Sequence, residues 1–310
     1  MKIVMVERNS VGLDVQVDSY KQLGDVTYYP HTTAEEAAKN IGEADVVISN
    51  KLQLNETTLK DCPNVKLICN TATGFDNIDL EYCNKRGIRV TNVKDYSTAA
   101  VAQHTFAMLF YLLESLAYYD QYVKSGSYIN DTIFSHFSTS FHELHGMTWG
   151  IIGLGAIGRR VAEIATAFGC NVQYYSTSGK NSNSQYKRVE LDELLSTSDI
   201  VSIHAPLNEQ TEGLINKEAL AKMKKSAILL NVGRGPIIVE EDLAKALQNE
   251  TIKAAGLDVL CAEPMSENNP LFEIKDSTKL FISPHMAWAS LEARARLMQT
   301  IFEQVRDFFA

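Results

Sequence analysis

Apolar runs and helical patterns alternate along the first hundred residues of the chain. Short runs rich in Val and Ile predict strands at residues 2–7, 26–29, 45–49, 66–70 and 88–91. Amphipathic segments between these runs predict helices at residues 18–23, 33–41, 55–61 and 79–86. Asp79 stands at the N-cap position of the last helix and Gly87 follows it, which is the usual order of helix-start and helix-stop residues. This alternation predicts a parallel, doubly wound sheet.

The second part of the chain repeats the alternation. A helical pattern without Pro or Gly covers residues 98–122, and a Ser-, Gly- and His-rich stretch at 124–146 is typical of a loop. Six more strands are predicted at 148–152, 171–175, 200–204, 227–231, 254–258 and 279–283, the number in a full Rossmann sheet. A last helix is predicted at 291–309.

We therefore predict an α/β protein with two doubly wound, Rossmann-like domains and a cleft between them. One domain would comprise residues 1–97 plus 287–310, and the other residues 98–286. The length of 310 residues allows two domains, and the content of 45% hydrophobic and 22% charged residues is ordinary for a globular protein.

Charge and hydropathy exclude several classes of partner. A formal net charge of −9 argues against nucleic acid or an anionic membrane as the main partner. The apolar run at the N-terminus meets Glu7 and Arg8 too early for a secretory signal. The apolar region 99–113 contains Gln103 and His104, so we do not expect it to span a membrane.

The cysteines favour a reducing compartment. There are five, at positions 62, 69, 83, 170 and 261, with no CxxC pair. An odd number at scattered spacings predicts reduced thiols in a cytoplasmic protein. No histidine or second cysteine stands at a metal-like spacing from them, so no metal site is expected.

A glycine-rich turn follows the strand predicted at 148–152. Gly153, Gly155 and Gly158 form a GxGxxG pattern, and an amphipathic segment begins at Arg159. Strand, glycine turn and helix together are the context that a dinucleotide-binding turn requires. The first glycine allows a tight turn, the second lets the backbone approach a diphosphate, and the third lets helix and strand pack closely. The pattern predicts a dinucleotide site.

Three charged residues stand where later strands of the same series end. Arg234 follows the strand at 227–231, Glu263 follows the strand at 254–258, and His285 follows the last strand. Taken singly, such residues are often a surface ion pair, a turn residue and a cap. Because ligands of open α/β sheets bind outside the carboxyl ends of the strands, their joint placement predicts a shared catalytic site.

The motifs around these residues resemble the D-isomer-specific 2-hydroxyacid dehydrogenases. They are Gly153-x-Gly155-x-x-Gly158, Asn231-Val232-Gly233-Arg234-Gly235, Leu257-Asp258-Val259 with Glu263-Pro264, and Ser283-Pro284-His285. The likeness extends to residues 72–79 and 92–104, and therefore covers nearly the whole chain. Residues 50–51, 72–74, 96–98 and 285–289 most resemble the glycerate dehydrogenase (hydroxypyruvate reductase) branch.

The resemblance implies a role for each of these residues. Arg234 would bind the substrate carboxylate and the reacting carbonyl oxygen, because a guanidinium fork suits a planar anion. His285 would be the general acid of reduction and the general base of oxidation, with Glu263 fixing its tautomer and stabilising its charged form. Backbone N–H groups near Thr73 and Gly74 would bind the substrate carboxylate.

The resemblance also implies that Lys51 would offset the carboxylate charge. Trp288 stands three residues after His285, where the chain is expected to return to the first domain. This position predicts that its ring is a wall of the substrate pocket, although a Trp packed in the interdomain hinge is the alternative. A wall of this size would favour hydroxypyruvate and glyoxylate over branched-chain 2-oxo acids or phenylpyruvate.

The resemblance also implies the residues that bind a nicotinamide dinucleotide. Asp258 would position the nicotinamide carboxamide, and His204, Ala205 and Pro206 would flank the adenine. The remaining cofactor residues it implies are Gly153, Gly155, Ala156, Ile157, Gly158, Ser176, Thr211 and Val232.

One position departs from the pattern of NAD enzymes. An acidic residue is expected at the end of the second strand of the sheet, where it binds the adenosine ribose. Ser176 stands there instead, followed by Thr177, Ser178 and Lys180, with no carboxylate in the turn and no arginine to bind a phosphate. The cofactor is therefore NAD or NADP on this reasoning.

The resemblance leaves alternatives to the reduction of hydroxypyruvate or glyoxylate. The chain could reduce larger 2-oxo acids, oxidise phosphoglycerate or act as a dinucleotide-sensing corepressor, although the corepressor role would not need the Arg-Glu-His set. Glu263 argues against formate dehydrogenases, which have Gln there. The long helix predicted at 98–122 could serve a homodimer, as it does in the family.

Overall fold

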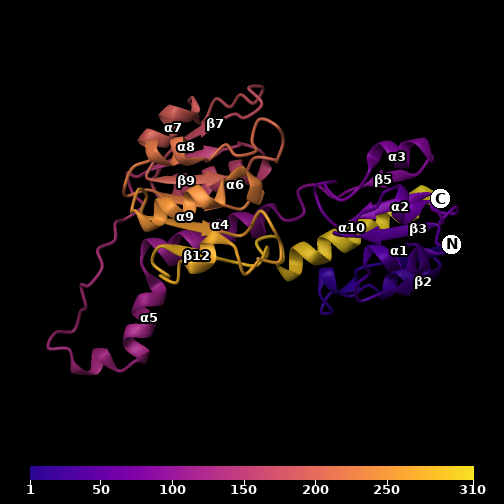
Figure 1. The fold of residues 1–310 in the computed structure, drawn as a ribbon, viewed down its shortest axis with the longest axis horizontal. Coiled ribbons are helices and arrows are strands. Elements are labelled where there is room, and N and C mark those ends of the chain that lie inside the picture. The colour runs from indigo at the N-terminus through magenta and orange to yellow at the C-terminus, as the bar shows by residue number, and fades with distance from the viewer. The chain divides into compact units, whose positions relative to one another are not determined.

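The computed structural model describes all residues 1–310, which form two compact units. Met1–Ser97 and Trp288–Ala310 make up the first unit, and Thr98–Ala287 make up the second. Each unit contains one parallel sheet with helices, which confirms the predicted α/β fold class (Figure 1). No helix combines the length and apolar character needed to cross a membrane.

The sheet of the first unit has five parallel strands in the order β2-β1-β3-β4-β5. The strands are β1 Lys2–Met5, β2 Asp25–Tyr28, β3 Val46–Ser49, β4 Leu67–Asn70 and β5 Arg89–Thr91. In register, Val4 of β1 pairs with Thr27 on one side and Val47 on the other. Every residue of β3 and β4 is buried, as expected for inner strands of a parallel sheet. The order places the carboxyl ends of β1, β3 and β4 next to one another.

Local capping signals set the helices of the first unit. The α-helices are α1 Ala34–Ile41, α2 Glu56–Leu59, α3 Leu80–Lys85 and α10 Leu291–Phe309, and the 3-10 helices are η1 Arg8–Val11 and η2 Asp18–Gln22. The N-cap prediction for Asp79 is confirmed, because its carboxylate accepts a 2.9 Å hydrogen bond from the Tyr82 N–H. Gly87, with φ of 69°, follows α3 in the left-handed region. The segment predicted as a helix at 18–23 is the 3-10 helix η2.

The sheet of the second unit has seven parallel strands in the order β12-β11-β10-β9-β6-β7-β8. The strands are β6 Thr148–Ile152, β7 Asn171–Tyr175, β8 Lys187–Arg188, β9 Ile200–Ile203, β10 Ile228–Asn231, β11 Ala254–Leu257 and β12 Leu280–Ile282. The prediction of six strands was wrong, because β8 adds a seventh at the edge beside β7. Two residues are too few to show a periodic pattern. The strand order reverses at β6, between β7 and β9, and such a switch point is where open α/β sheets bind dinucleotides.

The prediction of a single helix at 98–122 was also wrong. The structure has α4 Thr98–Leu113 and α5 Leu116–Lys124, separated at Ser115, whose φ of 53° and ψ of 43° are left-handed. Residues in this region are usually Gly, Asn or Asp, so a serine gives no signal of a break. α4 is largely buried against the sheet, whereas α5 has no buried residue. We call residues 116–146 the arm; it contains α5 and η3 Ser127–Asn130 and projects from the sheet of its own unit (Figure 1).

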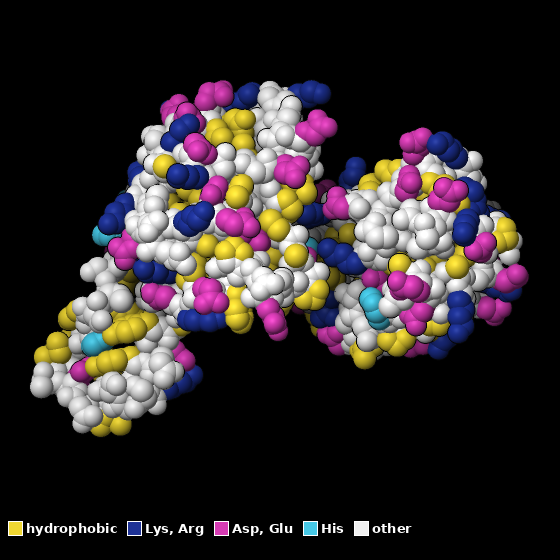
Figure 2. Space-filling model, in the orientation of Figure 1, with side chains coloured by type: hydrophobic (Ala, Val, Ile, Leu, Met, Phe, Trp, Pro, Cys, Tyr) yellow, Lys and Arg dark blue, Asp and Glu magenta, His cyan; other side chains and the backbone are white.

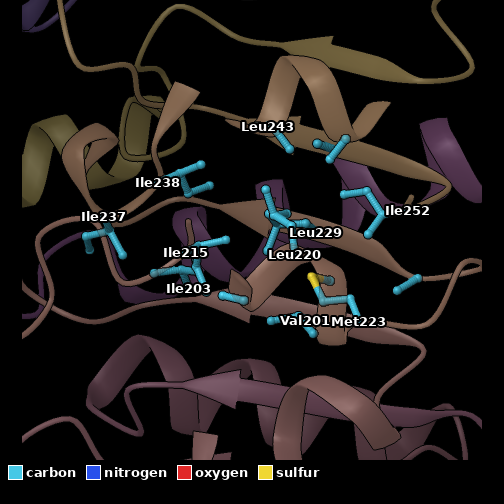
Figure 3. Close-up of a cluster of buried hydrophobic side chains, with 14 of the residues drawn as sticks. Val201, Ile203, Ile215, Leu220, Met223, Leu229, Ile237, Ile238, Leu243 and Ile252 are labelled. Atoms are coloured by element: carbon cyan, nitrogen blue, oxygen red, sulfur yellow. The ribbon is translucent and has the colours of Figure 1, made fainter. Parts of the chain in front are cut away.

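Hydrophobic side chains cover both faces of the second sheet. The other helices of this unit are α6 Ala156–Ala167, α7 Leu191–Thr197, α8 Lys217–Lys222, α9 Glu240–Gln248, η4 Gly235–Ile237 and η5 Pro270–Glu273. On one face, Val201 and Leu229 of the strands pack with Leu220 of α8 and Leu243 of α9 (Figure 3). On the other face, α4 and α6 pack against a cluster that includes the fully buried Trp149. The sheet is therefore covered on both faces, and the ends of its strands carry the predicted site.

Candidate active site

The three glycines after β6 have different surroundings. Gly153 has φ of +92°, and a Cβ there would lie 2.8 Å from the backbone of Ala205. A Cβ on Gly158 would overlap the carbonyl oxygen of Gly153. Gly155, the N-cap of α6, has open space where its Cβ would be. The first and third glycines are therefore required by the packing of the protein itself, and the second is not.

The start of α6 fits the diphosphate of a dinucleotide. Ala156, Ile157 and Gly158 form its first turn, whose N–H groups have no acceptor within the helix. No acidic side chain lies in this turn, and the positive end of the helix dipole favours an anion. The open space at Gly155 leaves room for a phosphate beside these N–H groups.

The turn after β7 closes on itself through Ser176. Its hydroxyl accepts a 3.2 Å hydrogen bond from the Asn181 N–H, and only 4% of the residue is exposed. The edge strand β8 brings an arginine to this turn, since Nη1 of Arg188 donates to the carbonyl oxygen of Gly179 at 3.0 Å. Arg188 was not predicted from the sequence, because only the pairing of β8 with β7 places it at this turn. The turn therefore combines hydroxyls with a cation from a neighbouring strand.

The segment after β9 presents its backbone to the glycine turn. Nε2 of His204 is hydrogen-bonded to the Ser202 hydroxyl at 2.9 Å. Burial lowers the pKa of the His204 imidazole to about 3, so the ring is neutral. Ala205 lies against Gly153. The buried Thr211 hydroxyl donates to the Pro206 carbonyl oxygen at 2.7 Å and so closes the following turn. Adenine contacts from 204–206 remain a prediction.

His285 and Glu263 form a hydrogen-bonded pair. Nδ1 of His285 lies 2.7 Å from Oε2 of Glu263, and the two side chains are 27% and 29% exposed. The other carboxylate oxygen of Glu263 accepts the Leu260 N–H at 3.1 Å, which fixes its orientation. His285 has φ of 52°, a left-handed conformation that is uncommon for histidine and is often found at functional sites. Two residues predicted for catalysis are thus in direct contact.

Asp258 holds the segment that carries this histidine. Oδ1 accepts the Ser283 hydroxyl at 2.7 Å and the Met286 N–H at 2.8 Å, and Oδ2 accepts the Ala287 N–H at 2.9 Å. The residue is 2% exposed, and its carbonyl oxygen also accepts the His285 N–H. The expected contact of Asp258 with the nicotinamide carboxamide stays a prediction. The observed bonds make it an anchor for the strained backbone at His285.

The Arg234 turn lies against the turn that leads to the glutamate. A Cβ on Gly235 would overlap the backbone of Leu260, so only glycine allows this approach. The Asn231 side chain holds the turn from within, donating to the Arg234 carbonyl oxygen and accepting the Gly233 N–H, both at 3.0 Å. Val232, in the same turn, is half-buried against the core. The turns of Arg234 and Glu263 are thus packed together.

A buried carboxylate that the sequence analysis did not single out braces the turn of Glu263. Glu240, at the start of α9, is 7% exposed. It accepts the Cys261 N–H on one oxygen and the Asn269 side-chain amide on the other, each at 2.7 Å. An acidic residue at a helix start is commonplace, so the sequence carries no signal of this role.

Besides Arg234, four residues are predicted to contact the substrate, and all four belong to the first unit: Lys51, Thr73, Gly74 and Trp288. Lys51 lies two residues after the end of β3 and is exposed. The Thr73 hydroxyl donates a hydrogen bond to the Val93 carbonyl oxygen at 3.1 Å. The Gly74 carbonyl oxygen accepts a hydrogen bond from the Asn70 side-chain amide at 2.7 Å. These bonds fix the turn after β4.

Trp288 stands where the chain re-enters the first unit. Its ring lies edge-to-face with Tyr96, with 6.2 Å between ring centroids. This contact fixes the orientation of the indole ring. Its role as a pocket wall stays a prediction.

These features define a class of protein. A dinucleotide-type glycine turn at the switch point of a parallel sheet indicates a redox cofactor. A histidine paired with a carboxylate can donate or accept a proton, and an arginine at a neighbouring strand end can bind an anionic substrate. The class is that of nicotinamide-dependent oxidoreductases.

Comparison with known proteins gives the family. Residues 106–287 match the D-isomer specific 2-hydroxyacid dehydrogenase, NAD binding domain. The chain belongs to the D-isomer specific 2-hydroxyacid dehydrogenases and is an NAD(P)-dependent oxidoreductase. The predicted family, enzyme class and cofactor type are confirmed.

The similarity covers the whole chain. A hydroxypyruvate reductase of Blautia hydrogenotrophica is 37% identical, over 99% of this chain and 97% of its own length. A glycerate dehydrogenase of Methylorubrum extorquens is 34% identical, over 100% of this chain and 96% of its own. Among solved structures, the D-lactate dehydrogenase of Aquifex aeolicus, complexed with NAD and lactic acid, aligns with a TM-score of 0.87 at 28% identity, covering 100% of this chain and 95% of its own.

Proposed function

We propose that the protein reduces a small 2-oxo acid, hydroxypyruvate or glyoxylate, to the corresponding 2-hydroxy acid, and catalyses the reverse reaction. The observation that carries this proposal is the 2.7 Å pair of His285 and Glu263 beside the packed turn of Arg234. The relative named hydroxypyruvate reductase, at 37% identity over 99% of the chain, supports this choice of substrate.

The contact between His285 and Glu263 determines which nitrogen of the histidine exchanges a proton with the substrate. Nδ1 of His285 donates to the Glu263 carboxylate, so Nε2 is the nitrogen that gives a proton to the substrate oxygen in reduction and takes it back in oxidation. When bound, a nicotinamide cofactor would supply the hydride to the carbonyl carbon in reduction and would accept it from the hydroxyl-bearing carbon in oxidation. The carboxylate of Glu263 stabilises the imidazolium form that reduction requires.

Arg234 and the first unit would hold the substrate anion. The Arg234 guanidinium would pair with the substrate carboxylate and polarise the carbonyl oxygen. Lys51 and the backbone near Thr73 and Gly74 would complete the binding of the carboxylate. We accordingly propose that residues 1–97 plus 287–310 act as the substrate domain and 98–286 as the dinucleotide domain.

A panel of 2-oxo acids assayed with NADH and NADPH tests this function. Hydroxypyruvate and glyoxylate should give higher kcat/KM than phenylpyruvate and 2-oxoisocaproate, because a wall at Trp288 excludes bulky side chains. Trp288→Ala should raise the relative activity on the bulky acids and leave the Kd of the cofactor unchanged. A wild-type preference for phenylpyruvate would overturn both the substrate and the role of Trp288.

We also propose that NADPH is used at least as well as NADH. No carboxylate lies in the turn of Ser176 to repel a 2′-phosphate, and Lys180 and Arg188 supply positive charge there. The ratio of kcat/KM for the two cofactors tests this preference. Strong wild-type specificity for NADH would contradict it.

A homodimer formed through the arm is the proposed assembly. Phe134 and Phe137 are 91% and 82% exposed, and Figure 2 shows hydrophobic side chains gathered on the arm. Contacts within the arm connect its helix to its loop: the rings of Tyr122 and His136 stack with 3.8 Å between their centroids. Exposed apolar side chains on an ordered element are typical of a protein interface, and a second copy is the occupant that the family resemblance favours.

Light scattering coupled to size-exclusion chromatography tests the dimer. The double substitution Phe134→Asp with Phe137→Asp should give a monomer. Leu13→Asp, a matched exposed apolar position in the first unit with 71% exposure, should leave the dimer intact. A monomeric wild type, or a dimer that survives the double substitution, would contradict this assembly.

A cytoplasmic location is proposed from the cysteines. All five are free, four of them are buried, and burial raises the pKa of Cys69 to about 12. Buried thiols that pair with no other cysteine suit a reducing compartment. Cell fractionation with an antibody against the protein tests the location, and recovery from an oxidising compartment would exclude it.

A further inference from the structure

A buried carboxylate lies beneath the proposed substrate-binding residues of the first unit. Glu7 follows β1 and is only 8% exposed. Its Oε2 accepts hydrogen bonds from three successive backbone N–H groups, those of Asn50 at 2.8 Å, Lys51 at 2.9 Å and Leu52 at 3.0 Å. The Ser49 hydroxyl donates a fourth at 2.9 Å. One oxygen thus determines the conformation of the whole turn after β3.

Successive N–H groups that converge in this way form a site for an anion. Here the anion belongs to the protein itself and comes from the neighbouring strand of the sheet. The bonds are charge-assisted, and therefore stronger than ordinary amide–carbonyl bonds. Because Glu7 occupies this site, the N–H groups of Asn50 and Leu52 are directed inward and Lys51 is presented on the exposed side of the turn.

The same polar network reaches the turn after β4. The Asn50 side chain donates to the Thr71 hydroxyl at 2.8 Å and to its carbonyl oxygen at 3.0 Å. The Asn77 side chain donates to the Leu52 carbonyl oxygen at 3.1 Å and is paired with the amide of Asn70. The Asn70 amide in turn holds Gly74. The turns of Lys51 and of Thr73 and Gly74 are therefore connected, with Glu7 at one end of the network.

We propose that Glu7 is a positioning residue for the substrate. It sets the turn after β3 and, through Asn50, the turn after β4, so that both turns present their groups to the substrate carboxylate at fixed spacing. This inference rests on the proposed function, because it takes those two turns as the site of the 2-oxo acid carboxylate. Glu7 acts through these turns and does not itself touch the substrate.

Two substitutions separate the position of the carboxylate from its charge. Glu7→Gln keeps the length of the side chain and one acceptor oxygen but removes the charge. Glu7→Asp keeps the charge but withdraws the oxygen by the length of one C–C bond, about 1.5 Å, so it cannot reach all three N–H groups. Tyr20→Phe is the control for lost stability, because it removes another buried hydrogen bond of this unit, the 2.6 Å bond to the Met298 carbonyl oxygen.

We expect a defect in substrate binding alone. Glu7→Asp should raise the KM for hydroxypyruvate and glyoxylate by about tenfold, with the Kd of NADH within twofold and kcat changed less than KM. Glu7→Gln should stay within about threefold of the wild-type KM, since an amide oxygen still accepts the N–H groups. Tyr20→Phe should lower the melting temperature without changing KM. Lys51→Met combined with Glu7→Asp should raise KM by less than the product of the single effects, because both act on one turn.

The outcomes are distinct from those that test the enzyme function. A wild type that reduces no 2-oxo acid with either cofactor overturns the proposed function and this role with it. An active wild type with an unchanged KM in Glu7→Asp overturns the role of Glu7 alone. A Glu7→Gln variant impaired more than Glu7→Asp would also overturn it, because charge rather than position would then matter. A Glu7→Asp variant that loses stability as Tyr20→Phe does, with no change in KM, would reduce Glu7 to a structural brace.

Discussion

The second glycine of the turn after β6 offers a test of the cofactor site that is independent of the substrate. A methyl group at Gly155 would meet no protein atom within 4 Å, and the backbone there has φ of −76° and ψ of −162°, which alanine can adopt. Gly155→Ala should therefore fold normally. Loss of chain entropy in the unfolded state should even stabilise it by about 0.4–1 kcal/mol.

The same methyl group would stand where the diphosphate approaches the start of α6. Forcing a methyl group into a well-packed contact typically costs about 1–3 kcal/mol, which corresponds to a rise of roughly 5- to 150-fold in the Kd of NADH. Gly158→Ala is the contrasting variant, because its Cβ would overlap the carbonyl oxygen of Gly153. In Gly158→Ala the overlap should therefore destabilise the folded protein and lower its melting temperature.

Two measurements on the same samples decide between these effects. Titration of NADH fluorescence gives the Kd, and thermal unfolding followed by circular dichroism gives the melting temperature. Gly155→Ala should have a weakened Kd with an unchanged or slightly raised melting temperature, and Gly158→Ala should be less stable. A folded Gly155→Ala that binds NADH as tightly as the wild type would refute the placement of the diphosphate at this turn.

Four further predictions concern the chemistry and the choice of cofactor. His285→Ala should lower kcat for reduction by roughly 10²–10⁴-fold with the Kd of NADH unchanged. Glu263→Gln removes the carboxylate that orients His285 and stabilises its charged form, and should lower kcat for reduction, by less than His285→Ala does; a kcat equal to that of the wild type would contradict the pairing. Arg234→Lys keeps the charge but loses the fork, and should lower kcat/KM on the order of 10²-fold, whereas near-normal kinetics would make Arg234 a surface charge. Ser176→Asp should shift the kcat/KM ratio toward NADH by about 1–3 kcal/mol through repulsion of the 2′-phosphate, and an unshifted ratio would place the discrimination elsewhere.

The features that could be predicted from the sequence are those that depend on neighbouring residues along the chain. The residue pattern at 291–309 matches α10 residue for residue, and Asp79 caps α3, because helix periodicity and capping are local. The glycine turn after β6 could be predicted because tight backbone approach admits no other residue at Gly153 and Gly158. Parallel strands end at one edge of a sheet, so the motifs at strand ends predicted the meeting of Glu263 and His285, which are 22 residues apart.

What only the tertiary structure decided depends on contacts between distant residues. The break at Ser115 occurs where the chain leaves the sheet, although nothing in the local sequence stops the helix. Arg188 reaches the turn of Ser176 only because β8 pairs with β7. Glu7 acts on N–H groups 43 to 45 residues away, which no spacing along the chain reveals. A buried carboxylate is identified by the donors that surround it, and these are assembled only when the sheet forms.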